Sequence, residues 1–314
     1  MTAKRESSKN KVRKVNKGAT LGIVCPSFYT TAAERVERFL SLLKQRGYNY
    51  RLGKSTYSQD GYLAGTDDVR ANDLMEMFLD DEIDAIICLL GGFGASRIVD
   101  KLDYQLIKNN PKLLIGFSDI TVLLNALYFK AGIPSVHGLV GTFLGHPEID
   151  EDSINDFFEI FNSDYQGRIL KNYQTPALTL VPGVSEGVIV GGNLSLITAL
   201  LGTPYEIDFT DKLVLIEEVE EKPYRIDRMF SSLRLSGALE KAKGYIFGKF
   251  TECTGPTKSY QALINEYFKD LNVPVIYEFQ TGHELPFINV PIGLKAKLDA
   301  HNKEITILEG LYQK

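Results

Sequence analysis

The sequence predicts an α/β protein of two parts, an N-terminal domain with a mostly parallel sheet and a C-terminal domain of α+β type in which strands dominate. In the first half, short apolar runs alternate with segments of helical period, which is the pattern of βαβ units. The run between Asp84 and Leu90 is apolar throughout, as in parallel strands that are buried on both faces. In the second half, runs of strand length follow one another with few helical segments between them.

The elements of the N-terminal half follow from apolar spacing and from the residues that end each run. Pro26 ends the first strand, because proline cannot donate a hydrogen bond to the ladder, and Gly47 closes the first helix. Thr66 or Asp67 is a suitable N-cap for the second helix. Strands are predicted at 20–24, 48–52, 84–90 and 112–116, and helices at 32–45, from 66 through 78, at 98–102 and at 120–127. The loops at the carboxyl ends of such parallel strands lie at one edge of the sheet, where functional loops gather.

The C-terminal half contains further runs of strand length. Strands are predicted at 187–192, 213–218, 244–248, 273–277 and 304–308, with a helix at 193–201. Between the halves, residues 148–156 are acidic and polar, and residues 163–174 lack any long period. We therefore predict a disordered basic tail at 1–17, an N-terminal domain at 18–160 and a C-terminal domain at 161–314.

Composition excludes several classes of protein. A net charge of -5 gives no reason to expect a nucleic-acid partner or an anionic membrane, and no apolar run has the length of a membrane span. The basic start is followed by an apolar stretch that stops at Cys25-Pro26, which does not fit a signal peptide, so we expect a cytoplasmic protein. The three cysteines are widely spaced and suggest neither a disulfide framework nor a metal site.

One segment has the pattern of a nucleophile elbow. The apolar run 112–116 breaks at Gly116, places Ser118 at the corner and continues with helical spacing. The amides of Asp119 and Ile120, at the start of the new helix, are then placed to stabilise an oxyanion. Ile120 stands where G-x-S-x-G has its second glycine, and a serine at a helix start is also a favoured N-cap. From these residues alone, the cap is the better interpretation.

A serine nucleophile needs a base and an acid that orients the base. Of the four histidines, His146 and His301 fall in exposed loops, whereas His137 and His283 are equally good candidates. For the acid, Glu217 and Glu218 end an apolar strand, where a bare charge is costly to bury. Because side chains alternate along a strand, only one of them can face the site; alternatively, both mark an exposed strand end.

The glycine-rich segment 91–94 follows an apolar strand. It does not complete G-x-G-x-x-G and lacks the lysine of a phosphate-binding loop. It fits better as a second source of oxyanion-stabilising amides, because an elbow amide usually works with an amide from a neighbouring strand-to-helix loop. No spacing of histidine, cysteine or carboxylates suits a metal ion, so no metal or other cofactor is predicted.

Taken together, segments from residue 19 to about residue 308 resemble the murein tetrapeptide LD-carboxypeptidase family of serine peptidases, which includes the microcin C immunity peptidases. The segments that carry the resemblance are Ile23-Val-Cys-Pro-Ser27, Ala64-Gly-Thr-Asp67 with Arg70, Asp84-Ala-Ile-Ile-Cys88, Gly91-Gly-Phe-Gly94, Leu102-Asp-Tyr104, Gly116-Phe-Ser-Asp119, Gly191-Gly-Asn-Leu194, Gly202-Thr-Pro-Tyr205, Pro223-Tyr-Arg-Ile-Asp-Arg228 and Gly282-His283. Singly these are weak signals, but their order across the chain is specific.

The resemblance implies a flavodoxin-like N-terminal domain that carries the nucleophile and a C-terminal domain that carries the acid and the base, with the active site in the cleft between them. The implied triad is Ser118, Glu217 and His283, with oxyanion donors at the amides of Asp119 and Gly92. It also implies a cytoplasmic homodimer.

The implied substrate is a small peptide, the murein tetrapeptide, from which terminal D-alanine is removed during cell-wall recycling. Leu90 stands where the family's carboxypeptidases usually have arginine, so an immunity-type peptidase or amidase that cleaves an aminoacyl or peptidyl nucleotide is the alternative. A non-catalytic α/β ligand-binding protein is the alternative of another class. Arg225 or Arg228 is a candidate for binding the substrate carboxylate, although Arg228 can equally have a structural role beside Asp227.

Overall fold

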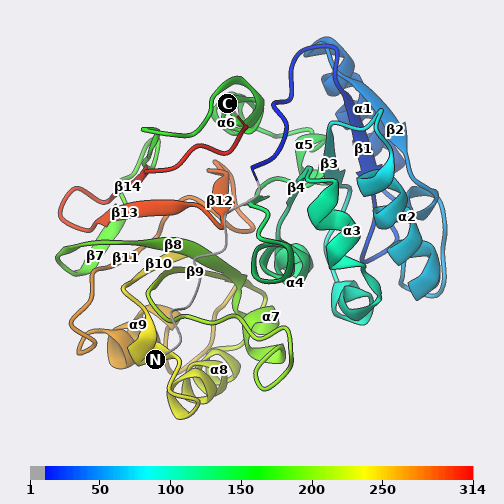
Figure 1. Ribbon diagram of the computed structural model, residues 1–314. Coiled ribbons are helices and arrows are strands. Elements are labelled where there is room, and N and C mark those ends of the chain that lie inside the picture. Colours follow the sequence, from blue (N-terminus) through cyan, green and yellow to red (C-terminus); the bar gives the residue numbers. More distant parts are fainter. Residues whose placement is uncertain (1–10, 314) are drawn as a thin grey trace, which may run out of the picture.

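The computed structural model describes residues 11–313, which form two sheets with helices packed around them (Figure 1). The first sheet lies on the side of helices α1 to α3, and the second on the side of helices α7 to α9. Apolar residues of both sheets belong to one continuous core. The predicted fold class, a parallel α/β domain followed by a strand-rich α+β domain, is confirmed.

The first sheet has the strand order β12-β5-β4-β3-β1-β2. Strands β1 to β5 are parallel and run in the flavodoxin-like order 2-1-3-4-5, while β12 pairs antiparallel to β5 at the edge. These strands are β1 (Thr20–Val24), β2 (Asn49–Leu52), β3 (Ala85–Cys88), β4 (Leu113–Gly116), β5 (Ser135–His137) and β12 (Val290–Ile292). Its helices are α1 (Ala33–Gln45), α2 (Asp67–Leu79), α3 (Tyr104–Asn109), α4 (Thr121–Ala126), α5 (Gly141–Leu144) and α6 (Glu151–Asn162).

The second sheet has the order β6-β14-β13-β8-β9-β10-β11-β7, with parallel strands β8 to β11 at its centre and antiparallel strands outside them. The strands are β6 (Ile169–Leu170), β7 (Leu178–Val181), β8 (Val184–Asn193), β9 (Lys212–Val219), β10 (Gly244–Thr251), β11 (Val275–Tyr277), β13 (Lys295–Asp299) and β14 (Glu304–Ile307). The helices that follow its strands are α7 (Leu194–Ala199), α8 (Pro223–Leu235) and α9 (Tyr260–Phe268).

One predicted helix needs correction, and several helices were not predicted. The segment 98–102 is not a helix but lies in short 3₁₀ turns, one of them Val99–Lys101. The acidic segment after residue 148 forms helix α6, because Asp150 caps it by accepting from the amide of Ser153 at 2.8 Å and apolar side chains such as Phe157 cover one buried face. Its many acids obscured that apolar stripe. Helices α8 and α9 were also not predicted.

The prediction of a disordered basic tail at 1–17 can be compared with the structure only for residues 11–17, because residues 1–10 lie outside the described part of the chain. For residues 11–17 the prediction of disorder is wrong. Val12 and Val15 are buried, and the Val12 amide donates to the carbonyl of Leu311 at 3.3 Å. Burial of these two apolar side chains holds the segment against the C-terminal end of the chain.

One strand from the C-terminal half of the chain belongs to the first sheet. Strand β12 lies in the C-terminal half of the sequence but pairs with β5 of the first sheet. The domain boundary near residue 160 therefore stays a prediction, and it does not separate the two sheets completely. In residues 11–313 we find no helix with both the length and the apolar character that a bilayer span requires.

Candidate active site

Ser118 occupies a strained corner at the carboxyl end of β4. Its φ is +63°, a left-handed conformation that non-glycine residues rarely adopt, and Phe117 before it is extended. A 3₁₀ turn, Ser118–Ile120, leads directly into α4. Neither this turn nor α4 has a side-chain cap hydrogen bond, so the interpretation of Ser118 as an N-cap is not supported. The geometry is that of a nucleophile elbow.

The glycine-rich segment lies directly against this corner. A Cβ added to Gly91 would lie 3.1 Å from the Cβ of Ser118, and one added to Gly92, whose φ is +105°, would lie 2.3 Å from the ring of Phe28. Glycine is therefore required at 92 both by conformation and by space. The amide of Ile120 donates to the carbonyl of Phe117 at 3.3 Å, so of the two elbow amides that of Asp119 is the candidate oxyanion donor, together with Gly92.

Glu217 and His283 come together beside the elbow. Glu217 lies on β9, and its fully buried Oε2 is 2.8 Å from Nδ1 of His283, in the loop that follows β11. The ring of His283 packs 4.8 Å from the ring of Phe117, the residue before Ser118. Glu217 of the second sheet and His283 of the loop between β11 and β12 thus lie beside Phe117, which precedes Ser118 in the first sheet.

The loop that carries His283 is fixed at both ends. Before it, the amide of Lys249 on β10 donates to the carbonyl of Thr281 at 2.8 Å. After it, β12 pairs with β5, so that Val290 lies opposite His137 in the first sheet. Gly282 has a φ of +127°, and a Cβ there would lie 3.3 Å from Oε2 of Glu217. The glycine therefore lets the loop pass close to the acid.

Glu218 has a different role from its neighbour. Its carboxylate accepts from the side-chain amide of Asn193 at 2.9 Å, and from both the amide and the hydroxyl of Ser195 at 2.8 and 2.7 Å. These donors lie at the start of α7, where a carboxylate satisfies helix amides that have no partner within the helix. As the alternation along β9 requires, only Glu217 contacts a histidine.

The other histidines are placed differently. His137 is fully buried between Phe117 and Phe287, neither ring nitrogen has a hydrogen-bond partner in the described structure, and burial lowers its pKa to about 4. It is therefore a neutral core residue at physiological pH. His146 accepts from the amide of Glu148 at 3.2 Å, and His301 is exposed. Two histidines that the sequence ranked equally are thus distinguished by a single hydrogen bond.

The pairing of His283 with Glu217 shifts the pKa of both groups. Burial acts to lower the pKa of His283, but the charge of Glu217 and the hydrogen bond to it outweigh burial, so the pKa lies above its ordinary value of 6.5. Burial acts to raise the pKa of Glu217, but His283 outweighs it in turn and the pKa is lowered. Glu217 is therefore ionised over the pH range in which His283 gains or loses its proton.

Other candidates lie outside this cluster. Arg225 is exposed on α8 and pairs with Glu221 at 3.4 Å, while Arg228 packs over the ring of Tyr224. Asp227 accepts from the hydroxyl of Tyr267 at 2.6 Å instead of pairing with Arg228. All three cysteines are buried and free. Within residues 11–313, no three or more histidine, cysteine, aspartate or glutamate side chains are grouped so as to hold a metal ion.

Comparison with known proteins places both halves of the chain. Residues 21–138 match the LD-carboxypeptidase N-terminal domain, and residues 186–298 match the LD-carboxypeptidase C-terminal domain. A protein of Bacillus subtilis (strain 168) named probable murein peptide carboxypeptidase is 38% identical over 311 residues, which cover 96% of this chain and 95% of that protein. The murein tetrapeptide carboxypeptidase of Pseudomonas aeruginosa is 30% identical over 285 residues, 86% of this chain and 90% of that protein.

Solved structures share the whole fold. The structure of MccF in complex with glutamyl sulfamoyl guanosine matches with a TM-score of 0.89 at 26% sequence identity, covering 96% of this chain and 99% of that one. The arrangement of two sheets described above is therefore the arrangement found in that protein.

Proposed function

The chain belongs to the LD-carboxypeptidase family, and on that premise we propose that Ser118, His283 and Glu217 are the nucleophile, the base and the orienting acid of a serine peptidase. The observation that carries the proposal is the hydrogen bond between Glu217 and His283 beside the strained elbow. With Nδ1 held by Glu217, the other ring nitrogen of His283 is left for the hydroxyl of Ser118.

The reaction follows from these positions. His283 accepts the proton of Ser118 as the hydroxyl oxygen attacks the scissile carbonyl, and Glu217 stabilises the imidazolium that forms. The amides of Asp119 and Gly92 hold the oxyanion. His283 then gives its proton to the leaving amine, and water hydrolyses the acyl-enzyme on Ser118. No step requires a metal or an organic cofactor.

The substrate that we propose is the murein tetrapeptide, cleaved between the L-centre of its third-position diamino acid and the terminal D-alanine. Support comes from the relatives named murein peptide and murein tetrapeptide carboxypeptidase. The reaction would take place in the cytoplasm during cell-wall recycling, with the protein acting as a homodimer. The second candidate is cleavage of an aminoacyl nucleotide analogue, favoured by Leu90 and by the likeness to MccF bound to glutamyl sulfamoyl guanosine.

Relative specificity separates these two candidates. We expect kcat/KM for the tetrapeptide to exceed that for an aminoacyl sulfamoyl adenylate by at least about 100-fold, since a site built for one polar ligand leaves groups unpaired with another. Murein pentapeptide, which has one residue more than the tetrapeptide after the scissile bond, serves as the control for chain length. A preference for the adenylate would favour the second candidate. Failure of folded protein to cleave any of the three would favour a binding protein.

The pH dependence tests the base. We expect kcat/KM to fall below a midpoint that lies above 6.5, because His283 must be neutral to accept a proton and its pKa is raised. In Glu217→Gln the charge that raises the pKa is absent while burial remains, so the midpoint should move to lower pH. A pH–rate profile of the native protein and an NMR titration of His283 in both proteins provide the measurement. An identical titration in both proteins would contradict the assignment.

A further inference from the structure

The side chain of Asp119 lies beneath the elbow and takes no part in the reaction described above. It is fully buried, and its Oδ2 accepts from the hydroxyl of Ser27 at 2.5 Å and from the amide of Ala95 at 2.8 Å. Ser27 follows β1, and Ala95 follows the glycine-rich segment after β3. One carboxylate oxygen therefore joins three loops at the carboxyl edge of the first sheet.

Arg70 ties two of these loops together from α2. Its guanidinium is fully buried and donates to the carbonyls of Pro26 at 2.6 Å and Gly94 at 2.8 Å, and it pairs with Asp67. Gly94 leaves room for this contact, since a Cβ there would lie 2.8 Å from the guanidinium. Arg70 thus joins the loops after β1 and β3 to each other. The carboxylate of Asp119 joins both loops to the elbow.

We propose that the Asp119 side chain is a positioning residue, which sets the spacing between the two oxyanion-stabilising amides by fixing the elbow to the glycine-rich segment. One of these amides belongs to Asp119 itself and the other to Gly92, three residues before Ala95. The inference rests on the proposed function, because it takes those two amides as the oxyanion donors. The sequence predicted a role for Asp119 through its backbone amide alone.

The consequence of losing this link is geometric. Without the carboxylate, the buried hydroxyl of Ser27 and the buried amide of Ala95 lose their hydrogen-bond acceptor. Because an unpaired buried donor is costly, we expect the glycine-rich segment to shift until these groups find other acceptors. A displacement of about 1 Å at a reacting centre lowers turnover about 100-fold, and loss of one oxyanion donor lowers it about 100- to 1,000-fold. Binding of the unreacted substrate is affected far less, because the oxyanion exists only in the transition state and the intermediate.

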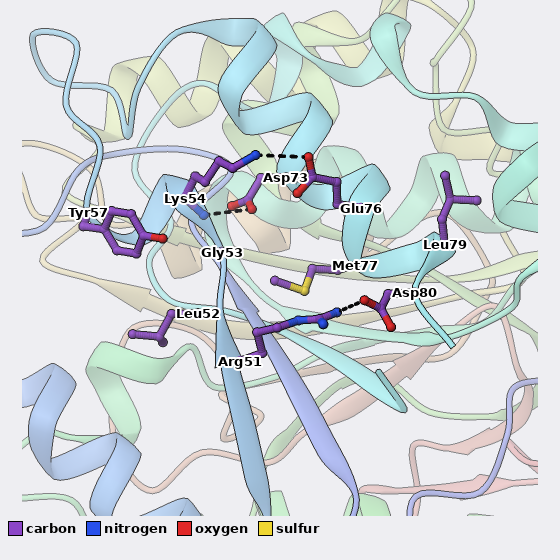
Figure 2. Close-up of a pocket in the computed structure, with 10 residues that line it drawn as sticks. All are labelled: Arg51, Leu52, Gly53, Lys54, Tyr57, Asp73, Glu76, Met77, Leu79 and Asp80. Carbon is purple, nitrogen blue, oxygen red and sulfur yellow. Dashed lines mark hydrogen bonds and ion pairs between the residues drawn. The ribbon is translucent and has the colours of Figure 1, made fainter. Parts of the chain in front are cut away.

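A second buried aspartate supplies a matched control. Asp73 on α2 accepts from the amides of Lys54 and Ser55 at 2.9 and 3.0 Å, and so holds the turn after β2. Asp73 and Lys54 line a surface pocket (Figure 2). Asp73 is buried like Asp119, although slightly less completely, and its hydrogen bonds go to neither the elbow nor the glycine-rich segment. Asp73→Ala should therefore cost stability without a specific loss of turnover.

The test measures kcat and KM on murein tetrapeptide, and the rate at which a fluorophosphonate labels Ser118, for folded Asp119→Ala, Asp119→Asn and Asp73→Ala. For Asp119→Ala we expect kcat and the labelling rate to fall about 100-fold with KM within about threefold. Asparagine keeps an acceptor oxygen, so Asp119→Asn should retain activity to within about tenfold. Asp73→Ala should stay within about threefold of the native protein in both rates, because its loss leaves the amides in place.

The inference is overturned if Asp119→Ala loses no more turnover per folded molecule than Asp73→Ala, or if its loss is confined to KM. Should Asp119→Ala fail to fold, Ser27→Ala removes one of the two bonds and is expected to lower kcat about 5- to 10-fold; unchanged kcat there would equally overturn it. Native protein that is labelled at Ser118 but leaves the tetrapeptide intact would refute the proposed substrate only, and labelling rates would still decide the positioning role. Absence of both reactions would refute both proposals.

Discussion

Ser118→Ala is expected to lower kcat/KM on murein tetrapeptide by at least about 10⁴-fold, because alanine removes the atom that attacks the carbonyl and leaves only binding and oxyanion stabilisation. The substitution deletes the side-chain oxygen of a half-buried residue. Alanine and serine pay a similar cost for the positive φ at this position. We therefore expect the unfolding midpoint in urea to stay close to that of the native protein.

Ser135→Ala is the matched control for this experiment. Ser135 is a buried serine on β5 of the same sheet, and its hydroxyl donates to the carbonyl of Leu124 at 3.2 Å. Its loss should leave kcat/KM within about threefold, as is usual away from a reacting centre. If Ser118→Ala retained more than about one hundredth of the native rate while folded, an elbow nucleophile would be excluded.

Glu217→Gln is expected to lower kcat/KM about 10³- to 10⁴-fold with KM little changed. A glutamine at this position cannot stabilise the imidazolium, and its amide can donate to Nδ1 of His283 and so favour the wrong tautomer. The size and shape of the side chain are preserved, so the buried contacts of β9 remain. The measurement is steady-state kinetics on the tetrapeptide, beside a urea titration of the same protein.

Glu218→Gln serves as the control one residue away. Its carboxylate holds the start of α7 through Asn193 and Ser195, so we expect a loss of stability of about 1–3 kcal/mol with kcat within about tenfold. The opposite pattern, with Glu218→Gln inactive and Glu217→Gln active, would transfer the role of the acid to Glu218.

Much of the fold could be predicted because parallel strands have a strong local signal. The strand at 20–24 coincides with β1, and the buried run after Asp84 contains β3. Helix α6 was missed because its acids hide an apolar face that only packing reveals. The pairing of β12 with β5 joins segments about 150 residues apart, and no local pattern records such a contact.

The sequence pattern predicted that the candidate site contains a serine, a histidine and a glutamate, but it did not decide the role of the serine or which histidine belongs to the site. The strand, glycine and helix pattern located Ser118, but spacing alone could not separate a nucleophile from a cap, because the φ of Ser118 is set by the folded corner. Nor could it rank His283 above His137, since the difference is a hydrogen bond to Glu217 that forms only when the two sheets meet. The resemblance to the LD-carboxypeptidase family, which the comparisons confirm, provided that choice.

Mass spectrometry of murein tetrapeptide, after incubation with the native protein and in parallel with Ser118→Ala, tests most directly whether Ser118 is the nucleophile of an LD-carboxypeptidase. We predict that the native protein removes a single D-alanine and leaves the tripeptide, and that the tetrapeptide stays intact with the variant. Cleavage at another bond, or equal loss of D-alanine with both proteins, would contradict a serine LD-carboxypeptidase centred on Ser118.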